Sequence, residues 1–170
     1  MTIPDLARRF ASTPATLAAT TAGTLATAVT GSVATDVDSR WYRKRKLPPW
    51  QPPRLAFPLV WTTLYADIAV TSAASLTRLR RTDPRAARRF GIALGVNLAA
   101  NAGWSVLFFR ARRPSLATAG ALALAASSAD LARRAATADR AHGVALAPYA
   151  AWCAFATALS ADIWRRNGDA

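Results

Sequence analysis

The sequence predicts an all-α protein, an integral membrane bundle of five transmembrane helices. One observation is that the charged residues gather in clusters, and the stretches between clusters are about as long as the ~20 helical residues that cross a bilayer. Another is that these stretches keep charge at their ends, whereas a soluble amphipathic helix carries polar residues on every turn. The hydrophobic content of 52% agrees with such a bundle.

A single domain spanning residues 1–170 is expected. The first apolar stretch is uncharged and longer than the apolar core of a signal peptide, so we interpret it as a membrane span. A bacterial cell membrane is the expected location. The joints are basic or rich in proline, and the expected helices cover residues 15–35, 55–77, 90–110, 114–136 and 143–165.

The net charge of +13 arises from 22 Lys and Arg residues against nine acids, all Asp. Composition alone fits either a membrane protein with basic loops or a soluble protein that binds nucleic acid. The clustering of charge favours the membrane protein, so no nucleic-acid partner is expected. The 22 cations divide evenly between the two sides of a five-helix bundle, and the positive-inside rule therefore assigns no orientation.

Few side chains are suited to metal binding or acid–base catalysis. Cys153 is the one Cys and lies in an apolar run, and His142 is the one His and is expected to lie solvated in a short loop. No metal site and no required cofactor are therefore predicted. Asp67 and Asp162 fall within expected spans, where carboxylates are candidates for function, and the sequence leaves their roles open.

The joint at residues 36–54 combines aromatic, basic and proline residues. Trp41, Tyr42 and Trp50 are residue types that favour the headgroup level of a membrane, and the prolines make the loop stiff. Two interpretations remain open. The loop anchors the protein at the interface, or it forms a rigid aromatic lid over a cavity between the helices.

Three of the expected helices place aromatic or amide side chains on one face. Asn in lipid needs a hydrogen-bonding partner, so Asn97 and Asn101 are expected to face inward. The alternative to a binding site is ordinary core packing around bulky rings. Small residues spaced four apart, at Gly91/Gly95 and Ala154/Ala158, also predict close helix packing. The aromatic faces comprise Trp61 and Tyr65, Trp104 and Phe108, and Tyr149 and Trp152.

Three motifs in a fixed order resemble the translocator protein family, also called TspO, the tryptophan-rich sensory protein or the peripheral-type benzodiazepine receptor. They are WYRKRKLPPWQPP…F..VWTTLY from residue 41, N…N..WS.LFF from residue 97, and PYAAW..FA..LS..IW..N from residue 148. Together they reach from residue 41 to residue 167.

The resemblance implies a five-helix membrane protein, commonly a homodimer, that binds porphyrins such as protoporphyrin IX and haem and acts in sensing, transport or regulation of tetrapyrrole levels. It also implies an alternative, a light-dependent porphyrin-degrading enzyme in which Trp61 and Trp152 form a redox pair. The ligand-binding positions that it implies are Trp41, Tyr42, Trp61, Tyr65, Asn101, Trp104, Ser105, Trp152 and Ala156.

The sequence departs from the family pattern in several respects, of which two bear on function. Asp67 and Asp162 stand where the family usually has uncharged residues. The sterol-contact motif of animal members needs a Tyr near the end of the last helix, and Ala161 stands there instead. The resemblance therefore does not support sterol binding by this chain.

Overall fold

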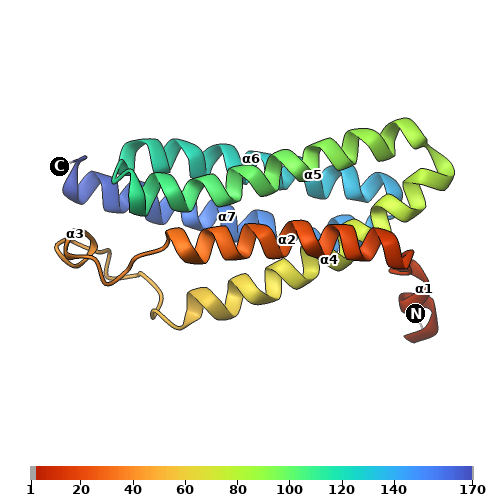
Figure 1. The fold of residues 1–170 in the computed structure, drawn as a ribbon, viewed down its shortest axis with the longest axis horizontal. Helices are drawn as coiled ribbons and strands as arrows, with labels where there is room; N and C mark the ends of the chain where they lie inside the picture. Colours follow the sequence, from red (N-terminus) through yellow and green to blue (C-terminus); the bar gives the residue numbers. More distant parts are fainter. Residues whose placement is uncertain (1–2, 170) are drawn as a thin grey trace.

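The computed structural model describes residues 3–169, and five long helices lie side by side along one axis (Figure 1). Each is long and apolar enough to cross a membrane, and the described residues contain no β-strand. The prediction of an all-α, five-span bundle is confirmed. The long helices are α2 (Pro14–Ala34), α4 (Ala56–Thr82), α5 (Pro84–Ser105), α6 (Pro114–Ala138) and α7 (Arg140–Asn167).

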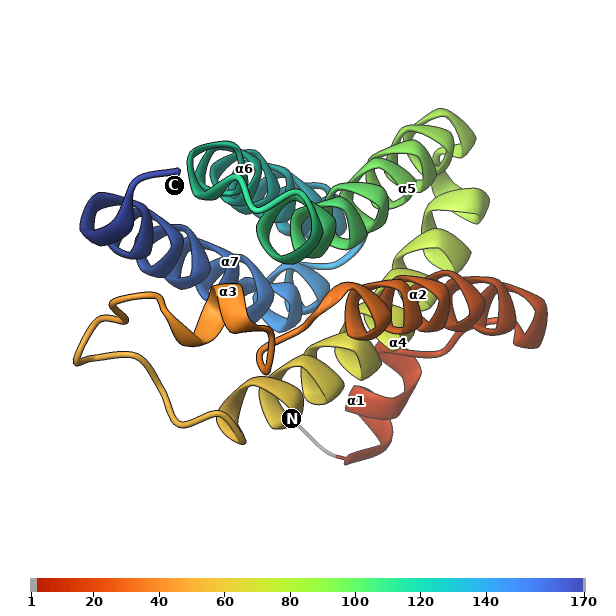
Figure 2. The same cartoon turned by 60° about the vertical axis from the view of Figure 1, so that its left-hand side comes forward.

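Three short elements complete the fold: α1 (Ile3–Arg9), α3 (Arg40–Arg43) and the π-helical turn η1 (Val106–Arg110), which continues α5. Helix α1 precedes the first span at one end of the bundle. Helix α3 belongs to the loop at the other end, beside the end of α7 (Figures 1 and 2).

The joint expected at residues 78–89 is almost entirely helical. Helix α4 continues to Thr82, and α5 begins at Pro84, so only Asp83 separates them. The arginines in this stretch are good helix formers, although they lower its hydropathy. Asp83 caps α5 because its carboxylate accepts the backbone N–H of Ala86 at 3.0 Å, and Pro84 needs no partner at the first helical position.

Helix α2 packs through a stripe of buried threonines rather than through large apolar side chains. The Thr20 hydroxyl donates to the Ala69 carbonyl of α4 at 2.8 Å, and the Thr27 hydroxyl donates to the Leu98 carbonyl of α5 at 3.5 Å. Small and hydroxyl side chains let helix backbones approach closely in lipid. The stripe consists of Thr16, Thr20, Thr24 and Thr27.

The closest helix approach at a glycine involves Gly143, where α7 meets α6. A Cβ added at Gly143 would lie 2.6 Å from the Ala136 Cβ and 2.9 Å from the Ala132 carbonyl oxygen, so only glycine fits there. The close approach predicted at Gly91 and Gly95 is wrong. A Cβ at Gly95 would meet nothing within 4 Å, and one at Gly91 would meet only a leucine side chain at 3.8 Å.

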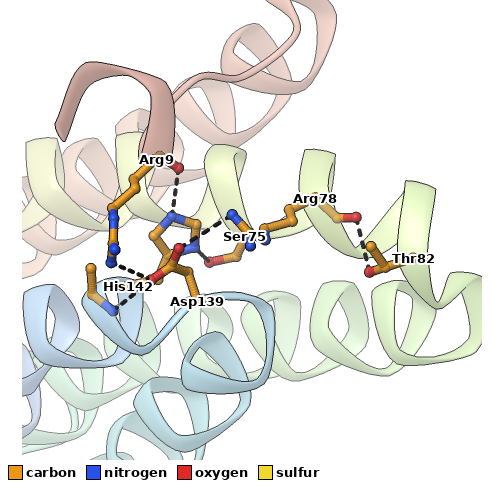
Figure 3. A network of polar contacts seen from close by, with 7 residues as sticks. Arg9, Ser75, Arg78, Thr82, Asp139 and His142 are labelled. Carbon is orange, nitrogen blue, oxygen red and sulfur yellow. Dashed lines mark hydrogen bonds and ion pairs between the residues drawn. The ribbon is translucent and has the colours of Figure 1, made fainter. Parts of the chain in front are cut away.

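A polar network fastens α1 to α4 and α7 (Figure 3). The fully buried His142 ring donates from Nε2 to the Arg9 carbonyl oxygen at 2.9 Å, and its Nδ1 lies 3.1 Å from the Ser75 Oγ. Asp139 forms ion pairs with Arg9 at 3.1 Å and Arg78 at 3.2 Å. The expectation of a solvated His142 in a loop is therefore wrong, because this residue lies in the first turn of α7 under α1.

Asp139 also caps α7 by accepting the backbone N–H of Ala141 at 3.0 Å. This hydrogen bond and the charges of Arg9 and Arg78 hold the pKa of the Asp139 carboxyl below its usual value. The ionised form is therefore stabilised in the folded protein. Its contribution is complete above the unfolded pKa of about 3.9 and is lost as the pH falls through the folded pKa.

The variant Asp139→Asn should melt at a lower temperature than the wild type at pH 7, by the equivalent of at most about 1 kcal/mol, because the two arginines are half exposed. Asn keeps the cap, so the Asp139→Ala variant should lose about 1 kcal/mol more. Melting in detergent micelles between pH 7 and pH 3 measures both effects. Other groups titrate in all three proteins. A difference between wild type and Asp139→Asn that does not shrink as the pH falls from 7 towards 3 contradicts the ion-pair explanation.

Candidate functional site

The loop between α2 and α4 is bound to the end of α7. The Trp50 indole Nε1 donates to Asp162 Oδ2 at 3.1 Å. The backbone N–H of Lys46 donates to the Asn167 Oδ1 at 2.8 Å, and the Asn167 Nδ2 donates back to the Lys46 carbonyl at 3.1 Å. These bonds hold the loop against the bundle, as a lid requires. Asp162, whose role the sequence left open, is one of the groups that hold it.

Beneath this loop lies a group of aromatic rings that we call the loop cluster: Trp41, Tyr42, Trp104, Phe108 and Phe109. The Trp41 and Phe108 centroids are 5.9 Å apart, those of Tyr42 and Phe109 are 5.5 Å apart, and Trp104 stacks on Phe108 at 5.7 Å. Burial raises the pKa of the Tyr42 phenol. The loop cluster joins the loop to α5 and η1, because Trp41 and Tyr42 come from the loop, Trp104 from α5, and Phe108 and Phe109 from η1.

The position of Phe108 and Phe109 depends on the π-helical turn η1. In this turn the backbone N–H of Ala111 donates a hydrogen bond to the carbonyl of Val106, five residues earlier, at 2.9 Å. A π turn adds a residue to the helix and so rotates the side chains that follow it. Such turns are frequent at functional sites. Nothing in the helical periodicity of residues 90–110 predicted this one.

Deeper in the bundle lies a second aromatic group, the interior cluster: Phe57, Trp61, Tyr65, Tyr149 and Trp152. Trp61 stacks on Tyr65 at 5.4 Å and meets the edge of Tyr149 at 6.3 Å, while Trp152 meets Phe57 at 6.0 Å. Trp61 and Trp152 thus both take part in the contact between α4 and α7. Among the described residues, no ring contact joins these two indoles directly.

A chain of hydrogen bonds connects four helices through the interior. The Tyr65 hydroxyl donates to Asn101 Oδ1 at 2.9 Å, and Asn101 Nδ2 donates to the Tyr149 hydroxyl at 3.0 Å. The Tyr149 hydroxyl donates to Asn97 Oδ1 at 2.8 Å, and Asn97 Nδ2 donates to Ser128 Oγ at 3.0 Å. The prediction that both asparagines face inward is confirmed by these bonds and by their burial.

Sequence reasoning missed the part that Ser128 and the Tyr149 hydroxyl play in this chain. The helical spacing shows Tyr149 only as a ring one turn from Trp152, and Ser128 belongs to a helix that carries no predicted site residue. A pattern within one helix cannot show which hydroxyl on another helix meets an amide. Because an unpaired amide is costly in lipid, the sequence indicates that Asn97 and Asn101 have hydrogen-bonding partners but does not identify them.

The remaining predicted positions lie around these groups. Ser105 is buried, and a Cβ added at Gly31 of α2 would lie 3.5 Å from its Oγ. Ala156 is half-buried on α7. Asp67 accepts a hydrogen bond from the Thr71 hydroxyl at 2.8 Å.

The Trp104 indole Nε1 is buried and has no hydrogen-bond partner among the described residues, which leaves a donor free for a ligand.

The structure therefore divides the predicted site residues into two neighbouring sets. Trp41, Tyr42 and Trp104 belong to the loop cluster. The second set lies around the interior hydrogen-bond chain and consists of Trp61, Tyr65, Asn101 and Trp152. Their role in binding a ligand remains a prediction. What the site offers chemically is aromatic surface, amide groups and one unpaired indole N–H beneath a basic loop.

The variant Tyr149→Phe keeps the ring and removes the hydroxyl that links both asparagines. It should lower the free energy of unfolding in micelles by about 1 kcal/mol, since hydrogen bonds in membrane proteins average about 0.6 kcal/mol and two are lost. The matched control, Tyr65→Phe, removes one terminal bond and should cost less. A loss in Tyr65→Phe that equals the loss in Tyr149→Phe would show that Tyr149 is not the junction.

The sequence profile of the TspO/MBR family matches residues 15–165, a range that includes both clusters and the loop. The translocator protein of Ovis aries is 33% identical over 128 residues, which cover 75% of each chain. Protein CrtK of Rhodobacter capsulatus is 31% identical over 128 residues, 75% of this chain and 78% of that one.

The tryptophan-rich sensory protein of Cereibacter sphaeroides is 30% identical over 129 residues, which cover 76% of this chain and 78% of its own length. The resemblance drawn from three motifs is thus confirmed over nearly the whole bundle. With its five apolar helices, the chain is a multi-pass membrane protein. It belongs to the TspO/MBR family.

Proposed function

We propose that this protein binds a tetrapyrrole, such as protoporphyrin IX or haem, between the loop cluster and the interior cluster, and that it acts in sensing or transport of tetrapyrroles. The observation that supports the proposal is that three helices contribute indoles to two neighbouring aromatic groups. Trp104 lies in the loop cluster, and Trp61 and Trp152 lie in the interior cluster, whose Phe57 also packs against the loop cluster. A tetrapyrrole is a wide, flat, apolar ring, and indole rings offer it favourable stacking surface.

The polar groups of a tetrapyrrole also have potential partners here. The ring bears carboxylates, and the Arg45 guanidinium lies in the loop, 4.8 Å above the Trp41 ring. Guanidinium groups bind carboxylates through paired hydrogen bonds. The unpaired Trp104 Nε1 is a further donor. Rings of the loop cluster touch each other, so the ligand would enter by separating the loop from α5 and η1.

The one histidine does not support haem binding through the iron. Both ring nitrogens of His142 already have partners, Arg9 and Ser75, at the end of the bundle away from the loop. The proposal therefore rests on ring stacking and carboxylate recognition. It applies equally to protoporphyrin IX, which has no metal.

The Trp61→Ala and Trp152→Ala variants should each weaken protoporphyrin IX binding about tenfold, since one aromatic contact contributes up to about 1.5 kcal/mol. Titration of detergent-purified protein, followed by the porphyrin absorbance band, measures the affinity. The matched control is Trp164→Ala in the last turn of α7, whose side chain is 42% exposed. Unchanged affinity in both interior variants, or an equal loss in the control, would contradict this placement of the ligand.

Light-dependent degradation of the bound porphyrin is a second candidate. The observation that favours it is that Trp61 and Trp152 lie in the same α4–α7 contact, and that Trp61 touches both Tyr65 and Tyr149. Indole and phenol side chains in contact can donate electrons to an excited porphyrin.

Illumination of the porphyrin complex in air tests this candidate. If the indoles take part, the wild type should convert the pigment to a new absorbing species, and a Trp61→Phe/Trp152→Phe variant saturated with porphyrin should do so much more slowly. Because both proteins are saturated with porphyrin, a slower conversion in the variant reflects the photochemical step and not weaker binding. Equal bleaching by the two proteins would leave tetrapyrrole binding intact and would exclude the indole pair as the reactive group.

A further inference from the structure

A cavity of about 460 Å³ lies at the end of the bundle opposite the α2–α4 loop, between the end of α4, the beginning of α5 and the end of α6. None of the predicted ligand-binding residues lines it. Its wall includes three arginine side chains, Arg89 of α5 and Arg133 and Arg134 of α6. The cavity is therefore basic, and the proposed tetrapyrrole site does not account for it.

The arginines of this cavity retain unused hydrogen-bond donors. Arg133 and Arg134 both bind Asp130 of the same helix, through two N–H groups of Arg133 and one of Arg134. Each guanidinium has five donors, so most remain available. Arg89 is exposed and has no partner among the described residues. Three guanidinium groups against one carboxylate leave a surplus of two positive charges.

The floor of the cavity is apolar. Leu79 and Phe90 line it and are almost completely buried, at 3% and 1% exposed, and Ala86 lies beside them. A ligand that fits both parts has an anionic group at the rim and hydrocarbon toward the floor. A small inorganic anion would satisfy only the arginines.

The depth of the arginines matches the headgroup region of a bilayer. Arg89 lies five residues after Pro84, the start of its span, and Arg134 lies four residues before Ala138, the end of its span. At 1.5 Å per residue, both lie about 6–8 Å inside the helix ends. The headgroup region on each side of the hydrocarbon core is about 5–8 Å thick. In a bilayer whose surface coincides with the helix ends, cations at this depth meet lipid phosphates.

The surroundings of the cavity are also cationic. The α4–α5 corner bears three further exposed arginines. Clusters of this kind next to membrane spans attract anionic lipids, and basic pockets between helices bind their headgroups. The three are Arg81, Arg85 and Arg88.

From these observations we propose that the α4–α5–α6 cavity binds the headgroup of an anionic phospholipid. The lipid phosphate contacts Arg89, Arg133 and Arg134, and the start of an acyl chain lies against Leu79 and Phe90. Asp130 holds the two α6 arginines in position. The site does not depend on tetrapyrrole binding and lies at the other end of the bundle.

Native mass spectrometry of the detergent-purified protein tests the proposal, with phosphatidylglycerol and phosphatidylcholine of identical acyl chains. Phosphatidylglycerol should bind several-fold more tightly. The Arg89→Gln variant should lose about fivefold in affinity for it, the equivalent of about 1 kcal/mol per arginine at a membrane surface. The matched control, Arg88→Gln, changes a neighbouring exposed arginine of the basic corner that does not line the cavity, and it should lose clearly less affinity than Arg89→Gln.

Three outcomes would overturn the proposal. Equal affinity for the two lipids would show that the cavity does not recognise negative charge. Equal losses in Arg89→Gln and Arg88→Gln would reduce the effect to general attraction by the basic corner. Displacement of phosphatidylglycerol by inorganic phosphate, compared with chloride at equal ionic strength, would make the site one for free phosphate. Melting temperatures of both variants confirm that they fold.

Discussion

The hydroxyl of Tyr149, bound to Asn97 on one side and to Asn101 on the other, is the interaction on which the arrangement of the site depends. In lipid an unpaired amide is costly, so these two asparagines must face a partner. The Tyr65 hydroxyl extends the chain to α4. These bonds fix how α4, α5 and α7 are rotated about their axes.

The rotation of each helix in turn determines where its tryptophan lies. Trp61 is one turn from Tyr65, Trp104 is one turn from Asn101, and Trp152 is one turn from Tyr149. Residues three or four apart share a helix face. Each hydrogen-bonded residue of the chain therefore turns a tryptophan on the same helix face toward the interior. The hydrogen-bond chain thus explains why tryptophans from distant parts of the sequence face the interior of the bundle, Trp61 and Trp152 in the interior cluster and Trp104 in the loop cluster.

The two ends of the bundle are closed by similar chemistry. At one end Asp162 accepts from Trp50 of the loop and pairs with Arg165 and Arg166. At the other, Asp139 pairs with arginines of α1 and α4. Asp139 and Asp162 thus each join segments that are distant in the sequence. Under the two proposals made above, arginines without a carboxylate partner bind an anionic lipid at one end of the bundle and the carboxylates of a tetrapyrrole at the other.

The sequence was sufficient to predict the five spans, because clustered charge and span length are properties of each segment alone. It also predicted inward-facing asparagines from the cost of an amide in lipid. It did not show that residues 78–89 are helical, because arginine lowers hydropathy without disfavouring a helix. The burial of His142 depends on Ser75 and Arg9, which are far away in the sequence, and the π turn at Val106–Arg110 has no counterpart in the helical periodicity of residues 90–110. The roles assigned to individual site residues came from family resemblance rather than from periodicity.

A double-mutant cycle on protoporphyrin IX affinity, with Tyr149→Phe and Asn97→Leu, tests most directly whether the hydrogen-bond chain positions the aromatic site. Neither change removes a tryptophan. If the chain acts as a unit, the second substitution should cost little once the first has broken it, and the two losses should be non-additive. Losses that simply add, or affinities equal to that of the wild type, would show that the indoles are positioned independently of Tyr149 and would contradict this account.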